Sequence, residues 1–195
     1  MRNSLREQIT KTRKENLDKL DDKLPSNDYI LEELDKLTGK RFIINYLMIH
    51  HALRNKDTNL KFVKSLPEKK DENYIYIKGK NAILYITDYK TENSHGDKEI
   101  KINNQKFIKE LKDMKLNDGD YILPKKDGSK ITNTTTYNDK IVKLTIDQLG
   151  QNKLTKIVIK DLLNHKNFEK LEQLGKDRGT SLEVLLKSYN LHNGN

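Results

Sequence analysis

Three short β-rich runs follow one another in the middle of the chain, and this block limits the fold more than any other feature. The runs NYIYIKG, AILYITDY and DKEIKIN occupy residues 73–79, 82–89 and 97–103. Clusters of turn-forming residues, Lys-Gly-Lys-Asn and Thr-Glu-Asn-Ser-His-Gly, separate them. Because connections this short join neighbouring antiparallel strands, the block predicts a three-stranded antiparallel meander.

Patterns typical of helices lie on both sides of this block. A polar stretch with widely spaced leucines covers residues 1–24, and a strongly apolar helix begins just after Gly39. Beyond the block the sequence predicts a helix, a short extended piece, a polar loop and four more helices, at residues 104–114, 119–124, 125–136, 137–149, 154–165, 167–177 and 181–189. Segregated helices and strands predict an α+β fold, mostly helical with a small sheet. We expect residues 1–25 to form an N-terminal helix or linker arm and residues 26–193 to form the main domain.

Charge and composition narrow the classes of function. Lys and Arg number 38 against 29 Asp and Glu, which gives a net charge of +9 and favours a polyanionic partner, nucleic acid first and an anionic membrane second. The absence of cysteine excludes disulfides, zinc fingers and thiol nucleophiles. No apolar run approaches the roughly 18 residues of a membrane span, and the charged N-terminus lacks a signal-peptide core. We expect an intracellular protein that needs no cofactor or metal, in the cytoplasm, the nucleus or a viral compartment.

Three separate segments carry candidate chemistry. Arg54 leaves the end of the apolar helix, where a guanidinium is well suited to bidentate contact with phosphate, although an arginine there also simply decorates a helix end. Lys90 lies at a hairpin turn after the second β run. Tyr189 closes the last helix, and a phenol is a weak nucleophile unless neighbouring cations stabilise its phenolate.

In this order, the three segments resemble the catalytic domain of the tyrosine recombinases, the phage-type integrases. The family motif LR-x-x-[DE]-x-x-x-L matches the run LRNKDTNL, which begins at Leu53. The family's hairpin lysine falls on Lys90, and its Gly-[His/Trp]-Ser motif, with a tyrosine nine residues after the His/Trp, falls on Gly179-Thr180-Ser181 and Tyr189. The resemblance covers residues 26–193 and implies a DNA recombinase that cleaves and rejoins strands through a 3′-phosphotyrosyl intermediate. It further implies double-stranded DNA as partner, a homo-oligomer during synapsis, and a source in a large DNA virus or mobile element.

The chain departs from the family pattern at three positions. The family's T-x-H-x-L-R-H segment corresponds to TKIVIKD, so that Ile157 replaces the histidine and Lys160 the second arginine. Thr180 takes the His/Trp place. The resemblance thus implies Arg54, Lys90, Lys160 and Tyr189 as the catalytic set, with Arg178, Thr180 and His165 as further phosphate-binding candidates. Three other hypotheses stay open: a DNA-binding homologue that has lost catalysis, a type IB topoisomerase-like relaxing enzyme, and a basic nucleic-acid binder in which Tyr189 only packs.

Overall fold

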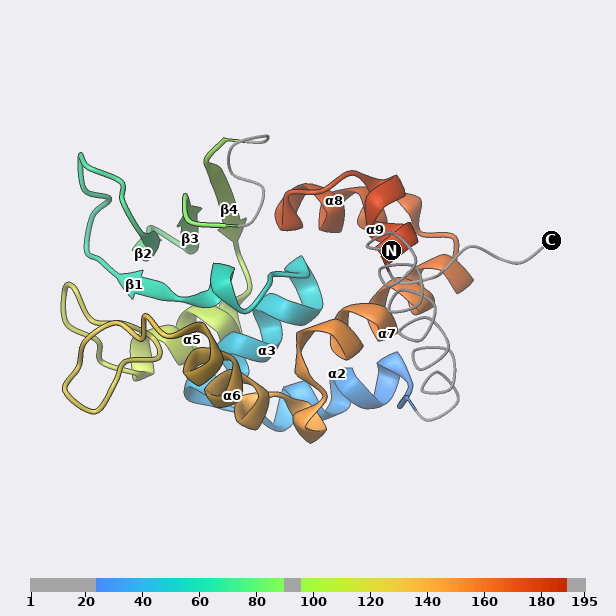
Figure 1. Ribbon diagram of the computed structural model, residues 1–195, viewed down its shortest axis with the longest axis horizontal. Coiled ribbons are helices and arrows are strands. Elements are labelled where there is room, and N and C mark those ends of the chain that lie inside the picture. Colours follow the sequence, from blue (N-terminus) through green and yellow to red (C-terminus); the bar gives the residue numbers. More distant parts are fainter. Residues whose placement is uncertain (1–23, 90–95, 189–195) are drawn as a thin grey trace, which may run out of the picture.

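The computed structural model describes residues 24–89 and 96–188, and the chain there is an α+β fold with a four-stranded mixed sheet at one end (Figure 1). The elements before and within the sheet are α2 (Asn27–Lys36), α3 (Gly39–His51), η1 (Lys56–Thr58), β1 (Leu60–Phe62), β2 (Asn73–Lys78), β3 (Asn81–Ile86) and β4 (Lys98–Ile102). Those after it are α5 (Gln105–Asp113), α6 (Thr134–Leu144), η2 (Ile146–Gln148), α7 (Gly150–Asn164), α8 (Phe168–Arg178) and α9 (Leu182–Ser188). Helices α7 and α9 lie on the side away from the sheet, and α8 lies between them and β4 (Figure 1).

Helix α3 is the centre of the core. It carries apolar side chains around most of its circumference, and Phe42, Ile44 and Leu47 are at most 2% exposed. Helices α2, α5, α6, α7 and α8 all pack against it. A helix that is apolar nearly all round is stable only when it is surrounded, so the sequence run FIINYLMI sets the middle of the domain.

The sheet confirms the predicted antiparallel meander and adds one strand to it. Strand β3 pairs antiparallel with both β2 and β4. The expected number of three strands is wrong, because the short segment β1 pairs in parallel with β2. The predicted extended piece at residues 119–124 supports this added strand: Phe62 N donates to Asp120 O at 2.7 Å, and Ile122 N donates to Leu60 O at 3.0 Å. Three residues are too few to show a periodic pattern in the sequence. The extended conformation of β1 is instead fixed by its pairing with the segments on both sides.

Polar side chains begin several of the helices. Ser26, Asn104, Asn133 and Asn167 each accept a hydrogen bond from a main-chain N–H in the first turn of α2, α5, α6 and α8. The predicted helices at 104–114, 137–149, 154–165, 167–177 and 181–189 correspond to α5 to α9, with boundaries shifted by a few residues. In the described ranges, no helix combines the length and the apolar character needed to cross a membrane. Nearly all of the expected N-terminal arm, residues 1–23, lies outside the described residues.

Candidate functional site

Arg54 and Arg178, which lie far apart in the sequence, each donate a hydrogen bond to the main chain beside the other. Helix α3 ends at His51, and the residue that caps it, Ala52, adopts a left-handed conformation with φ 50°, after which the chain reaches Arg54. Arg54 Nη1 donates to the carbonyl oxygen of Arg178 at 2.7 Å. In return, Arg178 Nη1 donates to the carbonyl oxygen of Ala52 at 2.6 Å. The end of α3 and the end of α8 are therefore held together by two cations.

Lys98 joins these arginines from the sheet. It is the first residue of β4, and its Nζ donates to the carbonyl oxygen of Asp177 at 2.8 Å. The same Nζ lies 3.8 Å from the centre of the Tyr89 ring. Burial, with a smaller contribution from the charges of Arg54 and Arg178, lowers the pKa of Lys98 to about 8, against the opposing effect of nearby carboxylates. We call Arg54, Lys98 and Arg178 the cation cluster.

Each member of the cation cluster donates to a main-chain carbonyl oxygen. A carbonyl group is neutral, so it fixes the position of a cation without cancelling its charge. This arrangement suits a site that receives an anion, because the cations are already positioned when the anion arrives.

A buried carboxylate lies beside the cluster. Asp57 is fully buried, and its Oδ2 accepts a hydrogen bond from the main-chain N–H of Arg54 at 3.1 Å. Burial raises the pKa of Asp57, while the three cations lower it. The contact closes the Arg54–Asp57 turn, which gives a structural role to the acidic position of the LRNKDTNL motif.

A second carboxylate attaches α8 to α3. The Oδ2 of Asp177 lies 2.6 Å from His51 Nδ1, and its Oδ1 accepts a hydrogen bond from Gln173 Nε2 at 2.7 Å. Both Asp177 and His51 are largely buried, with side chains 7% and 12% exposed. The pair fixes the last turn of α8, whose carbonyl groups bind Lys98 and Arg54.

The turn after α8 directs the chain into α9. Gly179 ends α8 in the left-handed conformation with φ 68°, and Thr180 N donates to Gly175 O at 2.9 Å. A side chain at Gly175 would come within 3.0 Å of the Thr180 carbonyl oxygen, so the close crossing requires glycine there. Ser181 Oγ accepts from Val184 N at 3.2 Å and begins α9. Helix α9 ends at Ser188, immediately before Tyr189.

The structure brings together some of the predicted site residues and separates others. Arg54 and Arg178 meet, and Thr180 follows directly after the α8 cap. Lys160 is exposed on α7. With Ser26 and Asp161 it lines a pocket of about 280 Å³, whose lining includes no residue of the cation cluster. His165 is also exposed and interacts with Asp161, 3.4 Å from its carboxylate.

The resemblance also singles out Lys90, Tyr189 and Ile157. Lys90 and Tyr189 lie outside the described residues. Ile157, at the family's histidine position, is 5% exposed and belongs to the core. In the ranges 24–89 and 96–188, no group of three or more His, Cys, Asp or Glu side chains is arranged to hold a metal ion.

Sequence reasoning missed Lys98, His51 and Asp177. Lys98 begins a β run, where a lysine is normally solvated, and the only available signal was its place on the same hairpin connection as Lys90. His51 and Asp177 are 126 residues apart. No local pattern connects two such residues, because their contact depends on how α3 and α8 pack.

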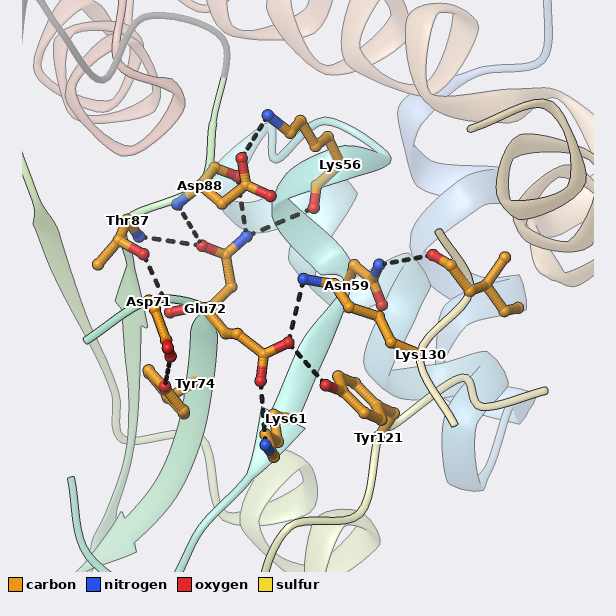
Figure 2. Close-up of polar contacts among 12 residues, drawn as sticks. Lys56, Asn59, Lys61, Asp71, Glu72, Tyr74, Thr87, Asp88, Tyr121 and Lys130 are labelled. Carbon is orange, nitrogen blue, oxygen red and sulfur yellow. Dashed lines mark hydrogen bonds and ion pairs between the residues drawn. The ribbon is translucent and has the colours of Figure 1, made fainter. Parts of the chain in front are cut away.

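A polar network holds the Arg54 turn against the base of the β3–β4 hairpin (Figure 2). The buried side chain of Asn73 donates through Nδ2 to Asp88 O at 3.0 Å, and its Oδ1 accepts from Thr87 N at 2.9 Å and Asp88 N at 2.8 Å. Lys56, in the Arg54 turn, forms an ion pair with the Asp88 carboxylate. The network therefore ties the segment after α3 to the strand end from which the hairpin starts.

Comparisons of the chain with protein-family models, curated proteins and solved structures found no match. The resemblance to tyrosine recombinases consequently depends on the motifs of the sequence, and the function has to be argued from the geometry of the cation cluster.

Proposed function

We propose that the protein cleaves and rejoins DNA strands, with Tyr189 as nucleophile and the cation cluster as the site of the scissile phosphate. The observation that supports this most directly is the reciprocal Arg54–Arg178 contact beside Lys98, at the turn that leads into α9. Phosphoryl transfer depends mainly on positioned positive charge, and this cluster supplies three cations within one set of contacts.

The proposed reaction conserves the number of phosphodiester bonds. The Tyr189 oxygen attacks phosphorus and loses its proton, the bond to the 5′ oxygen breaks, and a 3′-phosphotyrosyl bond forms. The leaving 5′ oxygen takes up a proton and becomes a hydroxyl group. Attack of a 5′-hydroxyl on the phosphotyrosyl bond reverses these steps, so no external energy source or metal ion is required by this chemistry.

The cluster supports specific roles for its residues. Arg54 and Arg178 hold the nonbridging oxygens, with Arg178 in the place that the sequence motif gives to Lys160. Lys90 is the proton donor that the family resemblance implies. Lys98, with a pKa of about 8, is mostly protonated at neutral pH and is a second candidate for that step.

Double-stranded DNA is the proposed partner, and joining two duplexes calls for a homo-oligomer on DNA. The net charge of +9 supports a polyanionic partner. We expect duplex affinity to fall with salt at a log–log slope of about −0.9 for each phosphate contacted. A binding titration that is flat in salt would contradict a phosphate-based interface.

A second candidate function is DNA binding without cleavage. The observation that favours it is the buried Ile157, because this side chain offers no hydrogen bond where the family has a histidine. The same DNA interface would then serve only to bind.

The deciding experiment is covalent trapping on a nicked suicide duplex that loses its leaving strand. We expect the wild-type chain to form a protein–DNA band on a denaturing gel. Tyr189→Phe keeps the ring and should bind the duplex with unchanged affinity but form no band. Binding without a band in the wild type would support the second candidate, and a band from Tyr189→Phe would show that the nucleophile assignment is wrong.

A further inference from the structure

A second pocket opens next to the Arg54 turn, between η1 and the polar segment that leads into α6. It encloses about 270 Å³, and its lining includes Lys56, Asp88, Lys130, Thr132, Thr134 and Asn138. Two ammonium groups and two hydroxyl groups there can donate hydrogen bonds, and one of the ammonium groups, that of Lys56, forms an ion pair with the Asp88 carboxylate. Asn138 Oδ1 already accepts from Asn55 Nδ2 at 2.8 Å, so what Asn138 offers the pocket is its NH₂ group. Donors of these kinds match the oxygens of a phosphate.

One of the two lysines is placed so that it can exchange partners. Lys130 Nζ lies 3.1 Å from Glu72 Oε1 (Figure 2). Glu72 also binds Lys61 Nζ at 3.0 Å and accepts a hydrogen bond from the Tyr121 hydroxyl at 2.6 Å. Glu72 therefore keeps two donors if Lys130 turns toward an anion in the pocket. The movement leaves no buried carboxylate without a partner, which keeps its cost low.

The second lysine connects this pocket to the cation cluster. Lys56 is two residues after Arg54 in the same turn, and two residues span at most about 7 Å. The pocket and the cation cluster therefore each take a basic residue from the same turn.

We propose that this pocket binds a phosphodiester of the DNA strand that occupies the cation cluster, close to the scissile phosphate. The inference rests on the proposed function, because it takes the bound anion to be DNA. It assigns Lys130 and Lys56 as backbone contacts that set the register of the strand, and it gives them no part in the chemical step.

The chain offers a matched pair of variants for the test. Lys130→Ala and Lys61→Ala each remove one ion pair to the same Glu72 carboxylate, and the two lysine side chains are 27% and 31% exposed. Only Lys130 lines the pocket. A purely structural role for the ion pairs predicts the same small effect for both variants, so a difference between them measures the phosphate contact.

The measurement is the affinity of the 195-residue chain for a duplex at several salt concentrations. We expect Lys130→Ala to reduce the log–log slope by about 0.9, the value for one phosphate, and Lys61→Ala to leave it unchanged. Lys130→Arg should keep the wild-type slope, and thermal melting of each variant checks that it is folded. Lys56→Ala provides a second reduction of about 0.9 if Lys130→Ala fails to fold.

The outcomes separate the pocket from the proposed function. Equal slopes for Lys130→Ala and Lys61→Ala, with tight binding by the wild type, would overturn the pocket and leave the proposed function standing. Absence of duplex binding by the wild type would overturn both. A slope change for Lys130→Ala with normal covalent trapping would support the pocket as a binding site outside the chemistry.

Discussion

Replacing Arg178 and Lys160 in turn asks which residue is the second phosphate-binding cation. Arg178 is 7% exposed, and its Nη1 donates to the carbonyl oxygen of Ala52, a residue that is 1% exposed. Arg178→Ala leaves that buried carbonyl without this donor. A hydrogen bond from a charged group contributes about 1.5–3 kcal/mol, so we expect the free energy of unfolding to fall by about 2 kcal/mol.

The effect on cleavage should be larger than the effect on stability. Loss of one positioned donor to a transition-state oxyanion costs on the order of 10²–10³ in rate, and Arg178→Ala should show a loss of this size. Lys160 is exposed and lines the pocket near Ser26, so Lys160→Ala should change the stability by no more than about 0.5 kcal/mol. We expect its cleavage rate to stay close to that of the wild type.

The assay is the rate of covalent adduct formation on the suicide duplex. It is run at a temperature at which circular dichroism shows each variant folded, so that the stability loss does not enter the rate. Arg178→Lys keeps a point charge without the bidentate fork and should give an intermediate rate. If Lys160→Ala abolishes the adduct while Arg178→Ala forms it at the wild-type rate, the reasoning from the Arg54–Arg178 contact is refuted.

Two further predictions concern pH. Burial lowers the pKa of His50 to about 4 from 6.5. Between these two pH values the unfolded chain binds more protons than the folded chain, so the free energy of unfolding falls as the pH is lowered through this interval. The loss is on the order of 3 kcal/mol. His50→Phe should lack this loss of stability, and its ring should keep the packing against Tyr46. Urea unfolding at pH 7 and pH 4.5 measures the loss in each protein. Equal losses in the wild type and the variant would contradict the prediction. Burial lowers the pKa of Lys98 to about 8 from 10.5, so the wild type should gain stability as pH rises between these values. Lys98→Met should show no such gain in stability. If the free energy of unfolding of the variant and of the wild type changed in parallel with pH, the prediction would be contradicted.

Local patterns were sufficient to predict most of the elements. The alternation and turn clusters of residues 73–103 define β2, β3 and β4, since each hairpin is specified by residues close in sequence. Strand β1 escaped prediction because its parallel pairing with β2 spans a polar connection and involves only three residues. Its apolar positions satisfy a helical pattern as well as an extended one.

In the candidate site, too, local motifs were predictable and contacts between distant residues were not. Arg54 stood out because a helix end and an acidic residue three positions later form a local motif. Arg178 was a candidate because it precedes the Gly-Thr-Ser cap. The contact between them was beyond the sequence, since the two residues are 124 positions apart. Lys98 was missed for a different reason: nothing around it distinguishes a lysine beneath a helix terminus from a lysine in solvent.

The way in which the cation cluster is held explains how three like charges can gather there. The last turn of α8 directs its free carbonyl oxygens toward Lys98 and Arg54, and the end of α3 offers the Ala52 carbonyl to Arg178. The partial negative charge of a helix C-terminus stabilises a nearby cation by about 0.3–1 kcal/mol, and the buried Asp57 accepts a hydrogen bond from the main-chain N–H of Arg54. Two helix ends therefore offset part of the mutual repulsion of the three cations. Because carbonyl groups are neutral, these three contacts position the cations without themselves adding a negative charge.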